Sequence, residues 1–187
     1  LSAAGLSLDK AKCFDRWSWD ITEQMLIEVG MPKSYVDAII RHHQSQKLYF
    51  AISGSMGPEM RQSNGHGQGD CFAILATSVY MALWTNLLQS DPAISTAGYF
   101  DDSHCYAVGP DDKAICSSLV TAWERSKKFD QLVGSRNNNS KSACFATSEG
   151  LSQTVSDATG IKLNGTLKLL GAYLNFSGDA FFSYFEP

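Results

Sequence analysis

The spacing of apolar residues along the chain distinguishes helices from strands. In several stretches apolar side chains recur every three or four residues, which predicts amphipathic helices there. The predicted helices cover residues 19–29, 34–40, 70–88 and 112–129. Gly30 ends the first of them, and Asp111 or Asp112 is placed to cap the last. The helix over residues 70–88 carries apolar side chains around most of its circumference, which predicts that it is buried.

Shorter apolar runs between turn residues predict strands. These runs lie at residues 6–9, 47–53, 94–100, 103–108, 143–146 and 167–176. A glycine-rich loop covers residues 54–69. The runs 94–100 and 103–108 are so close together that they predict a β-hairpin with Asp101 and Asp102 at its tip. Because hairpin strands are antiparallel and helices alternate with strands along the chain, we expect an α+β fold, a small antiparallel sheet with helices packed on one face.

Two adjacent carboxylates are an unusual choice for a tight turn. Such turns favour Asn-Gly or Asp-Gly because the backbone needs positive φ angles, whereas two neighbouring negative charges repel each other. Asp101 and Asp102 are therefore either a solvated acidic turn or part of a metal site. Asp9, at the end of another predicted strand, is expected to project beside the hairpin tip. Three carboxylates at one sheet edge would suit Mg²⁺, and a pair of such ions serves phosphoryl transfer.

Size, charge and cysteine content limit the classes of protein that fit. With 187 residues, 44% of them hydrophobic, the chain is long enough for one domain with a sizeable core. Its net charge of −4 counts against a nucleic-acid partner unless basic parts are missing, and the grouped Lys10, Lys12 and Arg16 are interpreted as a solvated face. No uninterrupted apolar run reaches the roughly 18 residues of a membrane span, so no membrane association is predicted. Five cysteines without a C-x-x-C pair fit a reducing, intracellular compartment, nuclear or cytoplasmic.

Five short motifs follow one another along the chain. They are D-x-x-K-x-F-D at residues 9–15, G-x-x-Q-G-D at 65–70, Y-x-D-D at 99–102, G-x-x-x-N-x-x-K-S at 134–142 and L-G within 169–171. Together they resemble the palm of reverse transcriptases, most closely that of non-LTR (LINE-type) retrotransposons, over about residues 6–176. The resemblance implies a polymerase-type palm with RNA-directed DNA polymerase activity. It also implies an RNA template, a DNA primer and deoxynucleoside triphosphates as partners.

The resemblance assigns catalytic roles to residues of three motifs. Asp9, Asp101 and Asp102 would hold two Mg²⁺ ions, with Mn²⁺ as an alternative metal. The primer 3′-hydroxyl would then attack the α-phosphate of a deoxynucleotide in line. Lys141 would neutralise phosphate charge or donate a proton to the departing pyrophosphate, unless it is a plain surface lysine.

Other motif residues would shape the nucleotide site. Gln68 and Gly69 would lie under the incoming nucleotide, because glycine lets the backbone approach a substrate and glutamine offers both a donor and an acceptor. Phe14 resembles a ring that lies beneath the sugar and excludes a 2′-hydroxyl, which favours deoxynucleotides; its alternative is a core aromatic residue. Tyr99 is expected to pack beneath the hairpin, near the primer end.

The chain also departs from the family's pattern. Cys71 follows Q-G-D where the family usually has proline, and Phe100 stands inside the carboxylate box where alanine or methionine is common. The chain begins with Leu1, just before the first aspartate, so we expect residues 1–187 to be a palm portion without fingers and thumb. Rival interpretations are a catalytically inactive reverse-transcriptase-like domain that binds RNA or protein, and the palm of a group II intron maturase.

The histidines show no spacing that supports a metal site. His66 and His104 are interpreted as incidental, and the adjacent pair His42 and His43, at the end of a predicted helix, as solvated. The sequence therefore predicts a single candidate metal site, at the aspartates.

Overall fold

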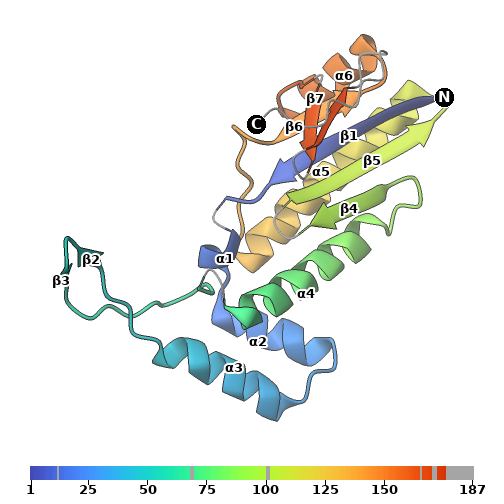
Figure 1. The fold of residues 1–187 in the computed structure, drawn as a ribbon. Coiled ribbons are helices and arrows are strands. Elements are labelled where there is room, and N and C mark those ends of the chain that lie inside the picture. Colours follow the sequence, from blue (N-terminus) through green and yellow to red (C-terminus); the bar gives the residue numbers. More distant parts are fainter. Residues whose placement is uncertain (12, 68–69, 100–101, 165, 170–171, 176–187) are drawn as a thin grey trace.

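Four antiparallel strands form the centre of the structure, a computed structural model that describes residues 1–11, 13–67, 70–99, 102–164, 166–169 and 172–175. They are β1 (Ser2–Asp9), β4 (Ser95–Tyr99), β5 (Asp102–Gly109) and β6 (Ala143–Ala146), in the spatial order β4-β5-β1-β6 (Figure 1). Each adjacent pair is antiparallel. The first strand of the chain, β1, therefore lies between strands that come much later in the sequence.

Three helices cover one face of this sheet. They are α4 (Cys71–Leu88), which packs along β4, α5 (Asp112–Val133), which runs behind the strands in Figure 1, and α6 (Glu149–Thr159), which packs on β6. Alternation along β1 directs Ala4, Leu6 and Leu8 into the core beneath these helices. Trp84 of α4 and Leu119 of α5 belong to the same buried cluster. The predicted α+β fold, with helices on one face of a small antiparallel sheet, is confirmed.

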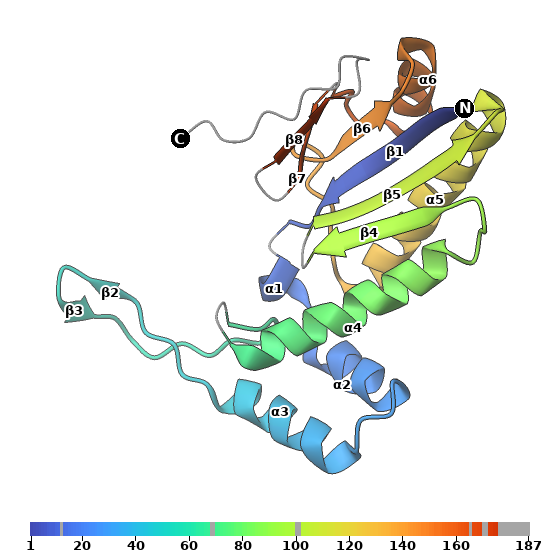
Figure 2. The same cartoon turned by 45° about the vertical axis from the view of Figure 1, so that its right-hand side comes forward.

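Two further helices, α2 (Trp19–Glu28) and α3 (Lys33–Ser45), lie on the side of α4 away from the sheet (Figure 2). They correspond to the two helices predicted there, and the short α1 (Cys13–Arg16) lies between β1 and α2 in the chain. Trp17 stacks on Tyr80 of α4, with ring centroids 3.9 Å apart. Leu26 of α2 and Ile40 of α3 are buried in a cluster that includes the start of α4. This packing fixes the end of α3 relative to the first turn of α4.

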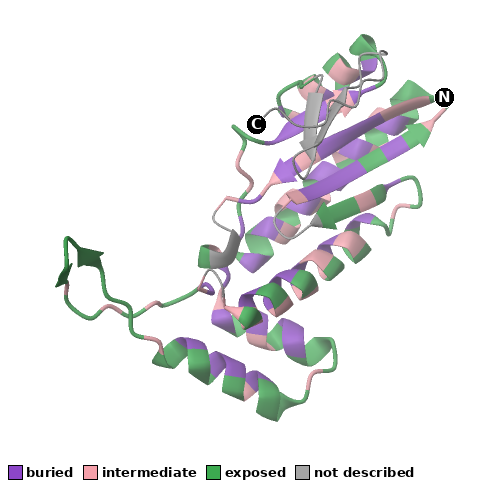
Figure 3. Cartoon of the chain, viewed as in Figure 1, coloured by how far each residue is buried: buried purple, intermediate pink, exposed green. Residues whose placement is uncertain are grey.

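Two small hairpins complete the described structure. β2 (Ala51–Ile52) pairs with β3 (Ser55–Met56) at the tip of a protruding arm, and β7 (Thr166–Leu169) pairs with β8 (Ala172–Asn175). The strand predicted over residues 47–53 is thus reduced to two residues. Both strands of this hairpin are exposed (Figure 3), so neither side of the predicted alternating pattern is buried against the rest of the protein.

α4 is buried along one face, whereas its apolar composition predicted burial around most of its circumference. Ala76, Tyr80 and Trp84 are buried, but Ile74 is 51% exposed. Among the helices in the described residues, only α4 is long and apolar enough to cross a membrane, by length and composition alone. In this structure it packs against β4, α2 and α5.

The sequence pattern missed α6. The hydroxyl of Ser148 accepts a hydrogen bond from the Leu151 N–H and caps the first turn, and Gly160 ends the helix with a φ of +72°. The helix buries only Leu151 and Val155. Two buried positions are too few to make a recognisable helical repeat.

A buried ion pair lies directly beyond the end of β1. The Lys10 ammonium donates to both carboxylate oxygens of Asp130 on α5, at 2.7 and 2.8 Å, and both side chains are almost fully buried. Burial raises the pKa of Asp130, although Lys10 and a hydrogen bond from Asn137 oppose that shift. The prediction of a solvated face is therefore wrong for Lys10, because the chain turns inward after Asp9 and meets α5.

Candidate functional site

The register of the central strands brings two of the predicted aspartates together. Asp9, the last residue of β1, is the antiparallel partner of Asp102, the first residue of β5, and Asp102 also pairs with Tyr99 of β4. Directly opposed residues have Cβ atoms about 4.5–5.5 Å apart and side chains on the same face. Because the neighbouring Leu8 points into the core, Asp9 and Asp102 face away from the three covering helices. We call this pair the carboxylate edge.

The loop after α5 holds the backbone of Asp9. The Asp9 carbonyl accepts a hydrogen bond from the Asn138 N–H at 2.7 Å, and the Asp9 N–H donates to the Ser142 hydroxyl at 3.3 Å. That hydroxyl in turn donates to the Asn138 carbonyl at 3.0 Å. Asn138 and Ser142 both belong to the fourth motif, residues 134–142. The structure shows what they do, which is to fix the end of the strand that carries Asp9.

Lys141, from the same loop, lies beside the carboxylate edge. Its Nζ is 3.8 Å from Asp9 Oδ1, and its side chain is 68% exposed while that of Asp9 is 23% exposed. An exposed pair of this kind contributes only about 0–1 kcal/mol to stability. The arrangement therefore supplies a movable positive charge next to the carboxylates rather than a structural clamp.

The remaining predicted site residues are described in part or not at all. Asp101, Gln68 and Gly69 lie outside the described residues, as does Phe100. Phe14 belongs to α1, just after the carboxylate edge, and Tyr99 closes β4 beside Asp102; for both residues only the backbone is described. Their predicted roles remain predictions.

Gly65 joins the second motif to the first. The Gly65 N–H donates to the Trp17 carbonyl at 2.7 Å, and the Trp19 indole donates to the Gly65 carbonyl at 2.6 Å. A Cβ at Gly65 would lie 2.5 Å from the Asp15 carbonyl oxygen, and the backbone has a φ of +81°. Both features require glycine. The segment that leads to Gln68 therefore lies directly on the segment that follows Asp9.

The carboxylate edge suits a hard divalent cation. Asp9 and Asp102 offer oxygen donors, which are the ligands that Mg²⁺ and Mn²⁺ prefer. Like charges directly opposite one another on neighbouring strands destabilise a sheet, and a bound cation would offset that repulsion. The residues at this edge are thus chemically suited to the ion that the motif resemblance implies.

A surface groove of about 600 Å³ lies between α1 and the end of α5. Arg16, Lys127 and Arg136 contribute positive charge to its lining, next to Gly134 and the buried Asp130. Asp130 already pairs with Lys10, so the groove presents an excess of positive charge. Such a groove can hold phosphate groups, in contrast to the acidic balance of the whole chain.

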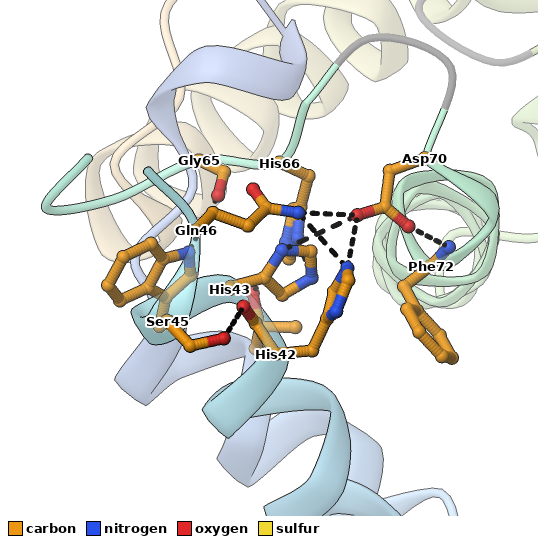
Figure 4. A network of polar contacts seen from close by, with 10 residues as sticks. His42, His43, Ser45, Gln46, Gly65, His66, Asp70 and Phe72 are labelled. Carbon is orange, nitrogen blue, oxygen red and sulfur yellow. Dashed lines mark hydrogen bonds and ion pairs between the residues drawn. The ribbon is translucent and has the colours of Figure 1, made fainter. Parts of the chain in front are cut away.

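A histidine cluster lies on the opposite side of α4 from the sheet (Figure 4). His43 is 1% exposed, so the prediction of a solvated pair is wrong for this residue, and His66 is fully buried. Burial, followed by the neighbouring His43, lowers the pKa of His66 to about 4, and burial also lowers the pKa of His43. The signal was present in the sequence, because His43 continues the buried stripe of Val36, Ile39 and Ile40 along α3.

Comparison with known proteins identifies the fold. No protein-family model and no curated protein sequence matches the chain. Among solved structures, telomerase from Candida tropicalis in complex with a TWJ fragment of telomeric RNA matches with a TM-score of 0.65 and 8% identity, over 94% of this chain and 29% of that one. Apo telomerase from Candida tropicalis truncated from its C-terminal domain matches with a TM-score of 0.64 and 12% identity, over 93% and 34%.

A third solved structure agrees with these two. Telomerase from Candida albicans, also in complex with a TWJ fragment of telomeric RNA, matches with a TM-score of 0.61 and 13% identity, over 92% of this chain and 30% of that one. The chain thus spans about a third of the length of these telomerase chains. The likeness shows that this chain shares its fold with that part of these telomerase chains.

Proposed function

We propose that this chain is the palm portion of an RNA-directed DNA polymerase, which adds deoxynucleotides to a primer 3′-hydroxyl. The observation that carries the proposal is the opposition of Asp9 and Asp102 at one edge of a sheet with a reverse-transcriptase-like fold. Two motifs far apart in the sequence meet where phosphoryl transfer needs paired carboxylates. The residues of all five motifs, and their order along the chain, favour an enzyme of the non-LTR retrotransposon type.

Asp9, Asp101 and Asp102 are the proposed metal ligands. Mg²⁺ bound there would lower the pKa of the attacking hydroxyl and stabilise the charge that develops on the phosphate. Strand register keeps the carboxylates of Asp9 and Asp102 on one face, and Asn138 and Ser142 hold the Asp9 backbone in place. The chain would therefore contribute position and charge rather than covalent chemistry.

The nucleotide would lie beside this edge. Phe14 is proposed to exclude a 2′-hydroxyl, Gln68 and Gly69 to contact the incoming nucleotide, and Tyr99 to pack near the primer end. The contacts of Gly65 with the segment around α1 support this arrangement, because they bring the Gln68 motif next to the helix that carries Phe14.

The RNA template and DNA primer would be held through their phosphates. The groove lined by Arg16, Lys127 and Arg136 offers positive charge for that purpose, on a chain whose net charge is −4. Lys141 is proposed to contact the phosphates of the nucleotide, because its ammonium group lies beside Asp9 and is free to move.

A second candidate function is binding without catalysis. Phe100 inside the carboxylate box favours a reverse-transcriptase-like domain that binds RNA and does not synthesise DNA. The two candidates make the same prediction for RNA binding and opposite predictions for DNA synthesis. A synthesis assay therefore separates them.

Primer extension on an RNA template, with Mg²⁺ and deoxynucleotides, tests the proposal in the full-length protein that carries this chain. Asp9→Asn is expected to lower the extension rate on the order of 10³-fold, since the charge stabilisation by a bound ion is worth several kcal/mol. Asp111→Asn is the matched control, because Asp111 caps α5 with a hydrogen bond from the Lys113 N–H at 3.0 Å, away from the carboxylate edge.

The outcomes separate the site from the function. Extension that survives Asp9→Asn would refute the assignment of the carboxylate edge. No extension by the unaltered protein, together with retained binding of the template and primer, would favour the inactive RNA-binding domain.

A further inference from the structure

The end of α3 and the start of α4 bring three possible metal ligands together (Figure 4). His42 and His43 lie in the last turn of α3, and Asp70 is the N-cap of α4. Asp70 Oδ2 is 3.4 Å from His42 Nε2 and 3.6 Å from His43 Nδ1, and the three atoms all lie within 4.8 Å of one another. They come from segments that are 27 residues apart along the chain, from His43 to Asp70.

The two distances from Asp70 Oδ2 are those of metal ligands rather than of hydrogen-bonded partners. A charge-assisted N–H···O bond measures about 2.7–2.9 Å, so both contacts are too long for one. With metal–nitrogen and metal–oxygen distances of about 2.0–2.1 Å, two ligands of a tetrahedral ion lie about 3.3 Å apart. The contacts to Asp70 are close to that value.

The hydrogen-bond network leaves a bare lone pair on His43 Nδ1. The Thr22 hydroxyl donates to the Ser18 carbonyl at 2.9 Å, so at its 3.4 Å contact with His66 Nε2 it accepts. His66 then carries its proton on Nε2, and its Nδ1 accepts from His43 Nε2 at 2.9 Å. With its proton on Nε2, His43 presents an unprotonated Nδ1 to the Asp70 carboxylate. That atom is buried and has no hydrogen-bond partner among the described residues.

His42 presents a second lone pair to the same place. The side-chain amide of Gln46 donates to His42 Nε2 at 3.0 Å, which requires that nitrogen to be unprotonated. The same amide lies 3.4 Å from Asp70 Oδ2. Two imidazole lone pairs and a carboxylate oxygen therefore converge, and the Gln46 amide contacts two of these three atoms.

Asp70 is held in the orientation that a ligand needs. Its Oδ1 accepts a hydrogen bond from the Phe72 N–H at 2.8 Å, and this cap leaves Oδ2 to face the two histidines. Burial works to raise the pKa of Asp70, but the cap and the nearby histidines outweigh it and lower the pKa.

We propose that His42 Nε2, His43 Nδ1 and Asp70 Oδ2 bind one divalent transition-metal ion, Zn²⁺, which ties the end of α3 to the start of α4. Imidazole and carboxylate ligands suit this ion. His66 and Thr22 lie behind His43 and orient it, as outer partners of metal-bound histidines do. The Gln46 amide rotates away when the ion binds, and water fills the fourth position on the half-exposed side of His42.

The proposed ion has a structural role next to the second sequence motif. Asp70 is the last residue of G-x-x-Q-G-D, and His66 lies inside that motif. Zn²⁺ would therefore fasten both ends of the segment 66–70 to α3, independently of any metal at the carboxylate edge.

Metal titration of the chain after treatment with a chelator tests this proposal. We expect one equivalent of Co²⁺ to bind and give the intense visible absorption of a low-coordinate site, Zn²⁺ to displace it, and Zn²⁺ to raise the melting temperature. His42→Ala and Asp70→Asn should each weaken Zn²⁺ binding at least tenfold. Both variants should fold, because His42 is half-exposed and asparagine caps a helix as well as aspartate does.

Two control variants make the result specific. Asp111→Asn changes the matching N-cap of α5, and Asp9→Asn removes a carboxylate of the other candidate site, so both should bind Zn²⁺ as the unaltered chain does. The proposal is overturned if the unaltered chain binds no stoichiometric Zn²⁺. It is equally overturned if His42→Ala and Asp70→Asn bind Zn²⁺ as tightly as the unaltered chain.

Discussion

The carboxylate edge and the histidine cluster, which comprises His42, His43, His66 and Asp70, are positioned by different kinds of structure. Each brings polar side chains from distant segments to one point, the first through Asp9 and Asp102 and the second through His43, His66 and Asp70. At the edge, strand register sets the directions of the side chains. In the cluster, the packing of α3 against the first turn of α4 sets them.

The difference determines how each region responds to change. A strand residue keeps its direction as long as the ladder holds, so the carboxylate edge depends mainly on the backbone of the sheet. Side chains that meet between helices depend on how closely the helices pack. We therefore expect the carboxylate edge to be disrupted by changes in the residues packed beneath its strands. The histidine cluster should be disrupted by protonation of its histidines or by changes in the loop geometry around it.

The largest expected effect comes from the layer beneath the carboxylate edge. Asp130→Ala leaves the Lys10 ammonium buried without its partner, and we expect the free energy of unfolding to fall by about 3–5 kcal/mol. Urea denaturation measures this change. The double variant Lys10→Met, Asp130→Leu removes both charges and should recover most of the loss. A single variant as stable as the unaltered chain would show that the ion pair does not support the edge.

The second-largest expected effect is a loss of stability in acid through the histidine cluster. Burial lowers the pKa of His66 from 6.5 to about 4, so the unfolded chain takes up this proton at a higher pH than the folded chain does. The contribution of His66 to the free energy of unfolding is therefore fully present above pH 6.5 and is lost as the pH falls to about 4. The total loss is on the order of 3 kcal/mol. Urea denaturation across this range, with a chelator present, checks it. His66→Gln should flatten the profile, and parallel profiles for the two proteins would contradict the prediction.

Gly65 connects the two regions, because it contacts the segment after Asp9 and precedes His66. Gly65→Ala combines a positive φ with a Cβ 2.5 Å from the Asp15 carbonyl oxygen, and we expect it to cost about 1–3 kcal/mol of stability. Gly30→Ala is the matched control, since Gly30 also has a positive φ but has nothing within 4 Å of the added Cβ. If the two substitutions lower the melting temperature equally, the close contact at Gly65 does not contribute to the loss of stability.

The smallest expected effect on stability is at the carboxylate edge itself. Asp9→Asn removes one of two like charges that face each other across β1 and β5, so in a chelator the chain should gain about 0.2–1 kcal/mol of stability. Denaturation with and without Mg²⁺ measures the gain and the loss of any protection by the ion. A clear destabilisation by this substitution would instead mark Asp9 as a structural residue.

Sequence alone predicted what depends on local pattern. The alternation through Leu6 and Leu8 and the short gap between the runs around Asp102 were enough to predict that Asp9 and the hairpin meet at one edge. The burial of Lys10 was not predictable in this way, because it depends on where α5 brings Asp130. The histidine cluster was missed for the same reason, although the helical stripe of α3 includes His43. The spacing of apolar residues within one segment does not indicate which residues of another helix will contact it.

The interior position of β1 has a consequence for how the chain folds as it is made. β1 is synthesised first, but its two neighbours are β5 and β6, so the sheet cannot be completed until Ala146 has left the ribosome. Until β5 and α5 have also been made, Leu6 and Leu8 have no complete core to enter, whereas α2, α3 and α4 have their partners close by in the sequence. Contacts over such long separations slow folding and prolong the exposure of apolar strands. The newly made chain is therefore expected to depend on chaperones until its last central strand arrives.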